Sequence, residues 1–206
     1  MRTQRCLGLA MLCAAAAACG DDAGTLTTPG GPSLSVTPPA CVEFGPPPPA
    51  GTIWGAPAGH VPGSSVHLEN GIKVLVQTFQ WGGGGSAFNF AQLGPPTYAF
   101  ANGQAAGINN INLQFLFGNL GWIPSKVYFS YLDEGGFENL SVNGSLYYIG
   151  DLHLAPPSVG GRNVSVSTWV PGPGAIAGWV KIDGGSIKTI TVGGQEFWID
   201  KVCAEP

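Results

Sequence analysis

The stretch NVSVSTWVPGPGAIAGWVKID, residues 163–183, decides the fold class of this chain. Apolar and polar residues alternate in both of its halves, which is the period of a β-strand with one buried face. In the first half the valines, Val170 included, fall on one side, and Ser165, Ser167 and Trp169 fall on the other. The Pro-Gly-Pro-Gly-Ala run separates the halves because it cannot continue a strand. The pattern predicts a hairpin of two strands, 163–170 and 176–183.

The same alternation recurs along most of the chain. Asn143-Gly144, between the apolar runs 140–142 and 146–148, predicts a type I′ hairpin turn. Helical spacing is absent outside the first twenty residues. Many short strands without intervening helices are typical of an all-β fold, and we predict an antiparallel β-sandwich (jelly roll) in one domain, residues 41–206. Further strands are predicted at residues 72–76, 111–117, 127–131, 187–192 and 196–203.

Two segments near the ends of this domain carry a resemblance to a known family. The first segment is Val42-Glu43-Phe44. The second is Gly193-Gly194-Gln195-Glu196-Phe197, which continues into the closing Trp198-Ile199-Asp200-Lys201-Val202. Together they resemble the galactose-binding-like jelly-roll superfamily. That superfamily includes many carbohydrate-binding modules. The resemblance spans most of residues 41–203 as a pattern, and the last strand is its most specific part.

The resemblance also implies a metal site. In the superfamily an aspartate on the final strand commonly helps to hold a structural calcium ion, together with groups from the start of the domain. Carried over, Asp200 is the expected ligand and Glu43 the candidate opposite it, with Lys201 standing where the family commonly has asparagine. Calcium prefers six to eight oxygen ligands, so main-chain carbonyls and water would complete the set. The alternative is that Asp200 accepts hydrogen bonds from a neighbouring loop or pairs with a lysine.

The N-terminus has the features of an export signal. Arg2 and Arg5 precede an apolar run that is too short to span a bilayer, so residues 1–18 are predicted to be a signal peptide. The run Ala16-Ala17-Ala18-Cys19 resembles a bacterial lipobox, which implies lipidation at Cys19. Ordinary cleavage after an Ala-x-Ala site is the alternative. We expect a bacterial surface or outer-membrane lipoprotein, or otherwise a secreted protein.

Residues 19–40 form a predicted flexible tether that is rich in Pro, Gly, Ser and Thr and contains no aromatic residue. Loss of Arg2 and Arg5 with the signal peptide leaves six basic residues against twelve acidic ones. This negative charge argues against nucleic acid as a partner, and it leaves contact with a membrane to the lipid anchor alone.

Two of the five cysteines bracket the predicted domain. Cys41 and Cys203 lie at its two ends, and an exported protein meets an oxidising environment. We therefore predict a disulfide between them, with two free thiols as the alternative. A C-x-x-C motif is absent, and His60, His67 and His153 are scattered along the sequence.

The alternation in residues 163–183 also places two tryptophans on the polar side of the hairpin. Trp169 and Trp179 become cross-strand or diagonal neighbours there, flanked by Ser165, Ser167, Lys181 and Asp183. An indole face can stack on the C–H face of a sugar while polar neighbours bond its hydroxyls. We predict a carbohydrate site at these six residues, and the alternative is that another segment covers the pair. The remaining tryptophans are expected to pack loops or, for Trp198, the core.

Catalytic motifs are absent from the sequence: it has no G-x-S-x-G elbow, no Walker loop and no H-E-x-x-H. His67 with Glu69 is expected to be a surface pair, and Asp133-Glu134 to serve the turn at Gly135-Gly136. The favoured function is therefore a non-catalytic, exported carbohydrate-binding module. The alternative is an adhesive surface protein that binds other proteins, and the minor alternative is a small glycoside or ester hydrolase that depends on Glu134 or Glu138.

Overall fold

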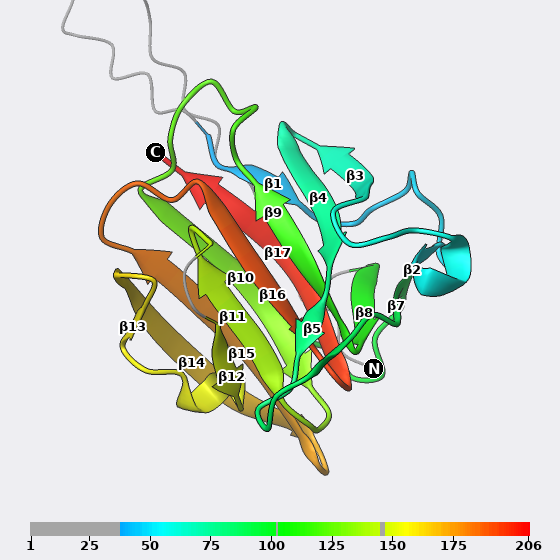
Figure 1. The fold of residues 1–206 in the computed structure, drawn as a ribbon. Coiled ribbons are helices and arrows are strands. Elements are labelled where there is room, and N and C mark those ends of the chain that lie inside the picture. The colour runs from blue at the N-terminus through cyan, green and yellow to red at the C-terminus, as the bar shows by residue number, and fades with distance from the viewer. Residues whose placement is uncertain (1–37, 102, 145–146) are drawn as a thin grey trace, which may run out of the picture. The chain divides into compact units, whose positions relative to one another are not determined.

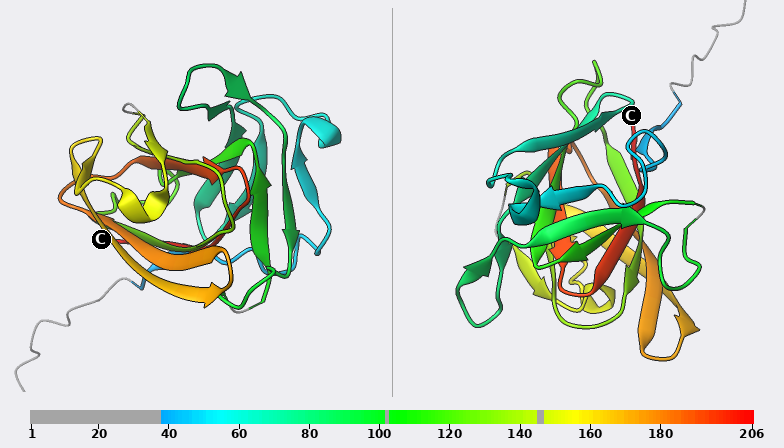
Figure 2. Two further views of the ribbon diagram at one scale, coloured as in Figure 1. Left: turned by 90° about the horizontal axis from the view of Figure 1, so that it is seen from below. Right: turned by 90° about the vertical axis from the view of Figure 1, so that its right-hand side faces the viewer.

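Alternating buried and polar residues build two antiparallel sheets that pack face to face (Figures 1 and 2). The computed structural model describes residues 38–101, 103–144 and 147–206. These residues form one all-β sandwich domain that is compatible with a jelly roll, as predicted. The predicted signal peptide, Cys19 and the tether up to residue 37 lie outside the described residues.

Sheet A has nine strands, in the order β13-β14-β15-β10-β17-β8-β7-β2, with β1 paired to β17. The closing strand β17 is central. It pairs with β10 along one edge, and along its other edge it pairs first with β8 and then, further along, with β1. The bounds are β1 Ala40–Val42, β2 Ile53–Gly55, β7 Phe90–Gly94, β8 Ala105–Asn109, β10 Lys126–Asp133, β13 Ser158–Val159, β14 Arg162–Gly172, β15 Ala175–Asp183 and β17 Phe197–Glu205.

Sheet B has six strands, in the order β12-β11-β16-β9-β4-β3. Its bounds are β3 Ser65–Glu69, β4 Ile72–Gln77, β9 Ile111–Leu116, β11 Glu138–Val142, β12 Tyr148–Gly150 and β16 Thr189–Gly194. A small ribbon of β5 Phe79–Gln80 with β6 Ser86–Ala87 and the 3₁₀ turns η1 Ala56–Ala58 and η2 Leu152–Leu154 complete the domain. Within the described ranges, no helix has the length and apolar character needed to cross a membrane.

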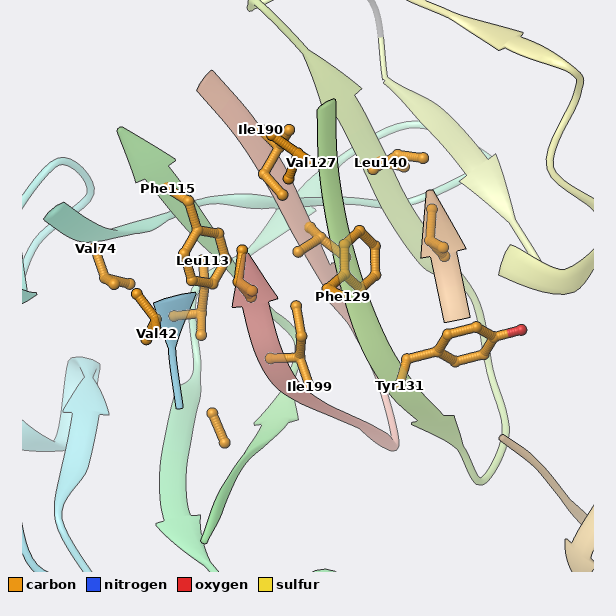
Figure 3. Packing of buried hydrophobic residues seen from close by; sticks show 14 of the residues in the cluster. Val42, Val74, Leu113, Phe115, Val127, Phe129, Tyr131, Leu140, Ile190 and Ile199 are labelled. Carbon is orange, nitrogen blue, oxygen red and sulfur yellow. The ribbon is translucent and has the colours of Figure 1, made fainter. Parts of the chain in front are cut away.

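The core lies between the two sheets (Figure 3). Strand β10 points Val127, Phe129 and Tyr131 inward, and they belong to the same core cluster as Leu113 and Phe115 from β9 of sheet B. All five are fully buried. Burial of each such side chain contributes about 1.5–3 kcal/mol, so this layer is the main source of stability.

One glycine makes room for Tyr131, the largest of the fully buried side chains. Tyr131 lies opposite Gly178 on β15, and a Cβ on Gly178 would come within 2.6 Å of both the Tyr131 ring and the main-chain oxygen of Ser167. The bare backbone therefore lets the phenol lie across the neighbouring strand. The ring also stacks on Phe197, with centroids 5.8 Å apart.

An amide ladder attaches the β5 ribbon to the outer side of sheet B. Asn139 accepts a hydrogen bond from the main-chain N–H of Gln80 at 2.7 Å and donates to its carbonyl oxygen at 2.9 Å. Asn112 donates to Asn139 at 3.1 Å and to the carbonyl of Thr78 at 2.8 Å. Both asparagines are buried, so these bonds satisfy groups that water cannot reach.

The strands predicted from alternation are present, and the Asn143-Gly144 turn differs in register. Both residues have positive φ, 56° and 71°, as a type I′ turn requires. However, Leu140 pairs with Tyr148, one residue away from the pairing that a two-residue turn would produce. Asn143 instead accepts hydrogen bonds from the N–H of Lys188 and donates to the carbonyl of Ser186, so its contacts lie with the β15–β16 loop.

The predicted disulfide is confirmed. Cys41 and Cys203 face each other directly in the β1–β17 pairing, with their Cα atoms 4.0 Å apart and an S–S bond between them. The bond joins the first strand to the last across 162 residues of sequence.

Candidate ligand-binding surface

The β14–β15 hairpin places both tryptophans on the outer face of sheet A, the side turned away from the core. Trp179 pairs with Ser167 and Trp169 pairs with Ala177, so the two indoles are diagonal neighbours. Val164 and Val180 point the other way into the core. Val170 was expected with these valines, but it is 76% exposed because a register shift between Trp169 and Gly172 interrupts the alternation.

Trp179 is half-buried beside an aromatic residue that the sequence did not single out. Tyr128 of β10 lies opposite Lys181, and its ring centroid is 6.3 Å from that of Trp179 at a tilt of 52°. Burial raises the pKa of the Tyr128 phenol. The available signal was its position on the polar side of the predicted strand 127–131. Trp179 and Tyr128 together form an aromatic patch on the outer face.

Trp169 is 38% exposed and leans toward the loop that joins β7 to β8. Together with Ala99, Phe100 and Ala101 it lines a shallow hollow of about 190 Å³. The loop thus covers part of the outer face next to Trp169. The two predicted tryptophans therefore differ in setting, since one borders a loop and the other lies against a neighbouring strand.

The four predicted polar residues surround these aromatic groups. Ser165, Ser167 and Lys181 are exposed. Asp183 is held from two sides, by Lys181 Nζ at 2.9 Å and by an amide N–H of Asn163 at 3.0 Å. The hydrogen bond from Lys181, with that from Asn163, lowers the pKa of Asp183. The serine hydroxyls are therefore freer to meet a ligand than the Lys181–Asp183 pair.

The residues expected to hold calcium lie on β17 and just after β1. Asp200 is 1% exposed, and within the described part of the chain its Oδ1 has no hydrogen-bond partner. Burial, followed by the charges of Glu43 and Glu69, raises its pKa to about 7. Glu43 is exposed. An open, buried carboxylate oxygen near two further carboxylates favours a cation.

The side chains around Asp200 nevertheless do not form a ready-made site. Among the described residues, no group of three or more His, Cys, Asp or Glu is arranged to hold a metal ion. Glu69 accepts hydrogen bonds from His67 Nε2 at 3.0 Å and from the N–H of Glu43 at 3.2 Å. The expected pair of His67 with Glu69 is present, but it is not a surface pair, because the His67 side chain is only 9% exposed and stacks on Trp54. An ion at Asp200 would need main-chain and water oxygens for most of its ligands.

The acidic residues of the hydrolase alternative do not all lie together: Asp133 and Glu138 are both buried and close enough for the charge of Asp133 to raise the pKa of Glu138, whereas Glu134 lies apart. Asp133 accepts a hydrogen bond from the N–H of Gly135 at 2.8 Å, which is turn chemistry. Glu138 is fully buried on the core side of β11, and burial raises its pKa to about 8. Glu134 instead accepts the indole N–H of Trp198 at 2.8 Å on the outer face of sheet A. Glu134, at the outer face of sheet A, therefore does not lie beside Glu138, which is on the core side of β11 in sheet B.

The other tryptophans follow the packing expectation, with Trp198 as a correction. Trp54 is buried in the core and stacks on His67, with ring centroids 5.8 Å apart, while Trp122 packs against the core margin. Trp81 contacts Phe79 edge-on. Trp198 lies on the outer face, because its neighbours Phe197 and Ile199 take the core side of β17.

Comparison with protein-family models, with curated protein sequences and with solved structures gave no significant match.

Proposed function

We propose that this chain is a non-catalytic carbohydrate-binding module, with the outer face of sheet A around Trp169 and Trp179 as its contact surface. The observation that carries the proposal is the presence of large aromatic side chains on the solvent side of a regular hairpin. Trp169 is 38% exposed, and packing within the domain does not explain why so large an apolar side chain faces solvent. Neighbouring exposed apolar side chains that form one contiguous patch commonly mark interaction sites.

The chemistry of this face suits a sugar. Trp169, Trp179 and Tyr128 supply apolar plates for the C–H face of a pyranose, and Ser165 and Ser167 supply hydroxyls for its polar edge. The all-β sandwich is compatible with the galactose-binding-like jelly roll that the sequence resembles. Membership of that superfamily, with its carbohydrate-binding modules, is part of the proposal.

The proposal includes export. The Cys41–Cys203 disulfide is the type of bond that persists in an oxidising compartment. We place the module on a bacterial cell surface, anchored through Cys19 by the tether that ends at residue 40. Intact-mass analysis of the membrane-associated protein tests this, because a lipidated N-terminal Cys19 supports the anchor and cleavage at another residue contradicts it.

We also propose a structural calcium ion at Asp200, with Glu43 as a second ligand. The support is the open, buried Oδ1 of Asp200 and its proximity to the charge of Glu43. Addition of millimolar calcium to chelator-treated protein is expected to raise the melting temperature of the wild type but not of Asp200→Asn. An equal rise in melting temperature in both proteins would contradict a calcium ion at Asp200.

The binding proposal is tested with the purified protein on a panel of neutral polysaccharides, with calcium and with chelator. The double variant Trp169→Ala, Trp179→Ala is expected to lose retention on the polysaccharide that the wild type binds, with little change in melting temperature. The matched control is Phe137→Ala, which removes another exposed aromatic ring.

Each other outcome has a definite meaning. No retention of the wild type on any polysaccharide, with capture of a protein partner that sugars do not compete away, would replace the proposal with an adhesive function. Release of product from a glycan or ester would replace it with a hydrolase. A large loss of stability in the double variant would show that the indoles are structural.

A further inference from the structure

A separate hollow on the outer face of sheet A is lined by other residues than the contact surface around Trp169 and Trp179, which we call the platform. It has a volume of about 360 Å³, and its lining residues include members of β7, β8 and the start of β17. These three strands are labelled in Figure 1. This volume falls within the range of small-ligand pockets. A second hollow of about 250 Å³ shares Gln92 and Trp198 with it. We call the pair the Trp198 hollow.

The indole of Trp198 is held rigidly in this hollow. Its ring lies flat over Gly107, where a Cβ would come within 2.9 Å of the ring atoms. Its N–H donates to Glu134 Oε2 at 2.8 Å, and Thr97 Oγ1 lies 3.4 Å from the same oxygen. Such an indole loses little side-chain entropy when a ligand packs on it.

The remaining lining combines carboxylates, amides and a second aromatic ring. Glu134 and the exposed Glu196 bring two negative charges, and Phe90 adds its ring. Amide groups come from Gln92, Asn109 and Gln195. The lining residues described for the hollow include no Lys, Arg or His.

Each of these groups selects one part of a ligand. Aromatic rings beside carboxylates attract an organic cation, through cation–π contact and through charge. Amide side chains bond hydroxyls, and the indole face accepts an apolar ring face. An amino sugar carries all three of the features that this lining selects, namely an ammonium group, hydroxyls and an apolar ring face.

We propose that the Trp198 hollow binds a positively charged amino sugar, such as a glucosamine residue of a deacetylated glycan. Glu196 pairs with the ammonium group, while Trp198, fixed by Glu134, carries the sugar ring. The site stands apart from the Trp169 and Trp179 platform, so it can exist whether or not that platform binds neutral polysaccharide. It disfavours uronic acids, because their carboxylates would face Glu134 and Glu196.

The test compares two ligands with the same sugar backbone, one with ammonium groups and the other with neutral acetamido groups in their place. Calorimetric titration of the purified protein at low salt and mildly acidic pH uses a glucosamine hexamer and its N-acetylated counterpart. The glucosamine hexamer is expected to bind at least tenfold more tightly. Glu196→Gln is expected to reduce that affinity about three- to tenfold, and added salt is expected to weaken it further.

The control separates a site from general attraction between a polycation and an acidic protein. Glu205→Gln removes a carboxylate that pairs with Lys126 on the same sheet and is expected to leave binding unchanged. Gln92→Ala provides a second, uncharged probe of the hollow, with an expected loss of about threefold. The proposal is overturned if the acetylated hexamer binds equally well, if Glu205→Gln weakens binding as much as Glu196→Gln does, or if neither hexamer binds.

Discussion

Replacement of Glu138 by glutamine should stabilise the protein at neutral and alkaline pH. Glu138 is 0% exposed on the core side of β11 and accepts the N–H of Leu152 through Oε2 at 2.9 Å. Its Oε1 is buried and has no hydrogen-bond partner among the residues that the structure describes. Burial, followed by the charge of Asp133, raises its pKa from 4.5 to about 8. Glutamine keeps the acceptor for Leu152 and removes the titration.

The sign and size of the effect follow from these two pKa values. Between pH 4.5 and pH 8 the folded protein holds a proton on Glu138 that the unfolded chain has released, so stability falls as pH rises through this window. Each pKa unit corresponds to about 1.4 kcal/mol, and the part of the shift titrated between pH 5 and pH 8 amounts to about 3 kcal/mol. For a domain of this size, that equals a change of about 6–12 °C in melting temperature.

The assay is urea unfolding from pH 5 to pH 8.5 in the presence of chelator. Glu138→Gln is expected to match the wild type near pH 5 and to exceed its free energy of unfolding by about 3 kcal/mol at pH 8. The exposed Glu196→Gln serves as the control, with the wild-type pH profile. Parallel profiles for Glu138→Gln and the wild type would refute the reasoning, because Glu138 would then titrate alike in the folded and unfolded chains.

Three further predictions concern contacts that hold separate strands of the fold together. Double replacement of Cys41 and Cys203 by alanine should cost about 5 kcal/mol, since the bond closes a loop of 162 residues, and thiol reductant should then no longer lower the melting temperature; an unchanged unfolding midpoint would contradict this. Asn139→Ala should lower the free energy of unfolding in urea by about 2–4 kcal/mol, because it leaves the part-buried N–H and carbonyl of Gln80 without their hydrogen-bond partner. A loss below about 1 kcal/mol would show that water replaces the lost hydrogen bonds. Gly178→Ala should cost about 1–3 kcal/mol by thermal melting, because the new methyl group meets Tyr131 and main chain, and neutrality would mean that the ring moves freely.

The sequence predicted best those strands in which large apolar residues alternate with polar ones. β4, β9, β10, β14 and β15 bury Val, Ile, Leu or Phe on one side, and this periodicity is visible without knowledge of any neighbour. β7 and β8 were not predicted, because alanine and glycine dominate Ala105–Asn109 and leave no strong alternation. The absence of a side chain at Gly107 leaves room for Trp198 of β17, which is 91 residues further along the sequence (198 − 107).

In the candidate site, too, some residues could be placed from local alternation and others could not. The side of the hairpin on which Trp169 and Trp179 lie follows from alternation within two adjacent strands. Tyr128 joins Trp179 only because β10 pairs with β15 in one particular register, and strand order is not encoded in local periodicity. The Trp198 hollow needs β7, β8 and β17 side by side, so the run 195–198 could not be grouped with Phe90, Gln92 or Glu134 from the sequence.

By itself, the sequence determined the all-β class, the bond between Cys41 and Cys203 and the outward side of the main hairpin, because strand period, the end positions of the two cysteines and turn residues are local or simple features of the chain. Tertiary structure alone decided the burial of Glu138 and Asp200, the separation of Glu134 from Glu138 and the grouping of Trp198 with Glu134. These depend on which strands become neighbours across long stretches of sequence. Such pairings arise from the packing of the whole sandwich.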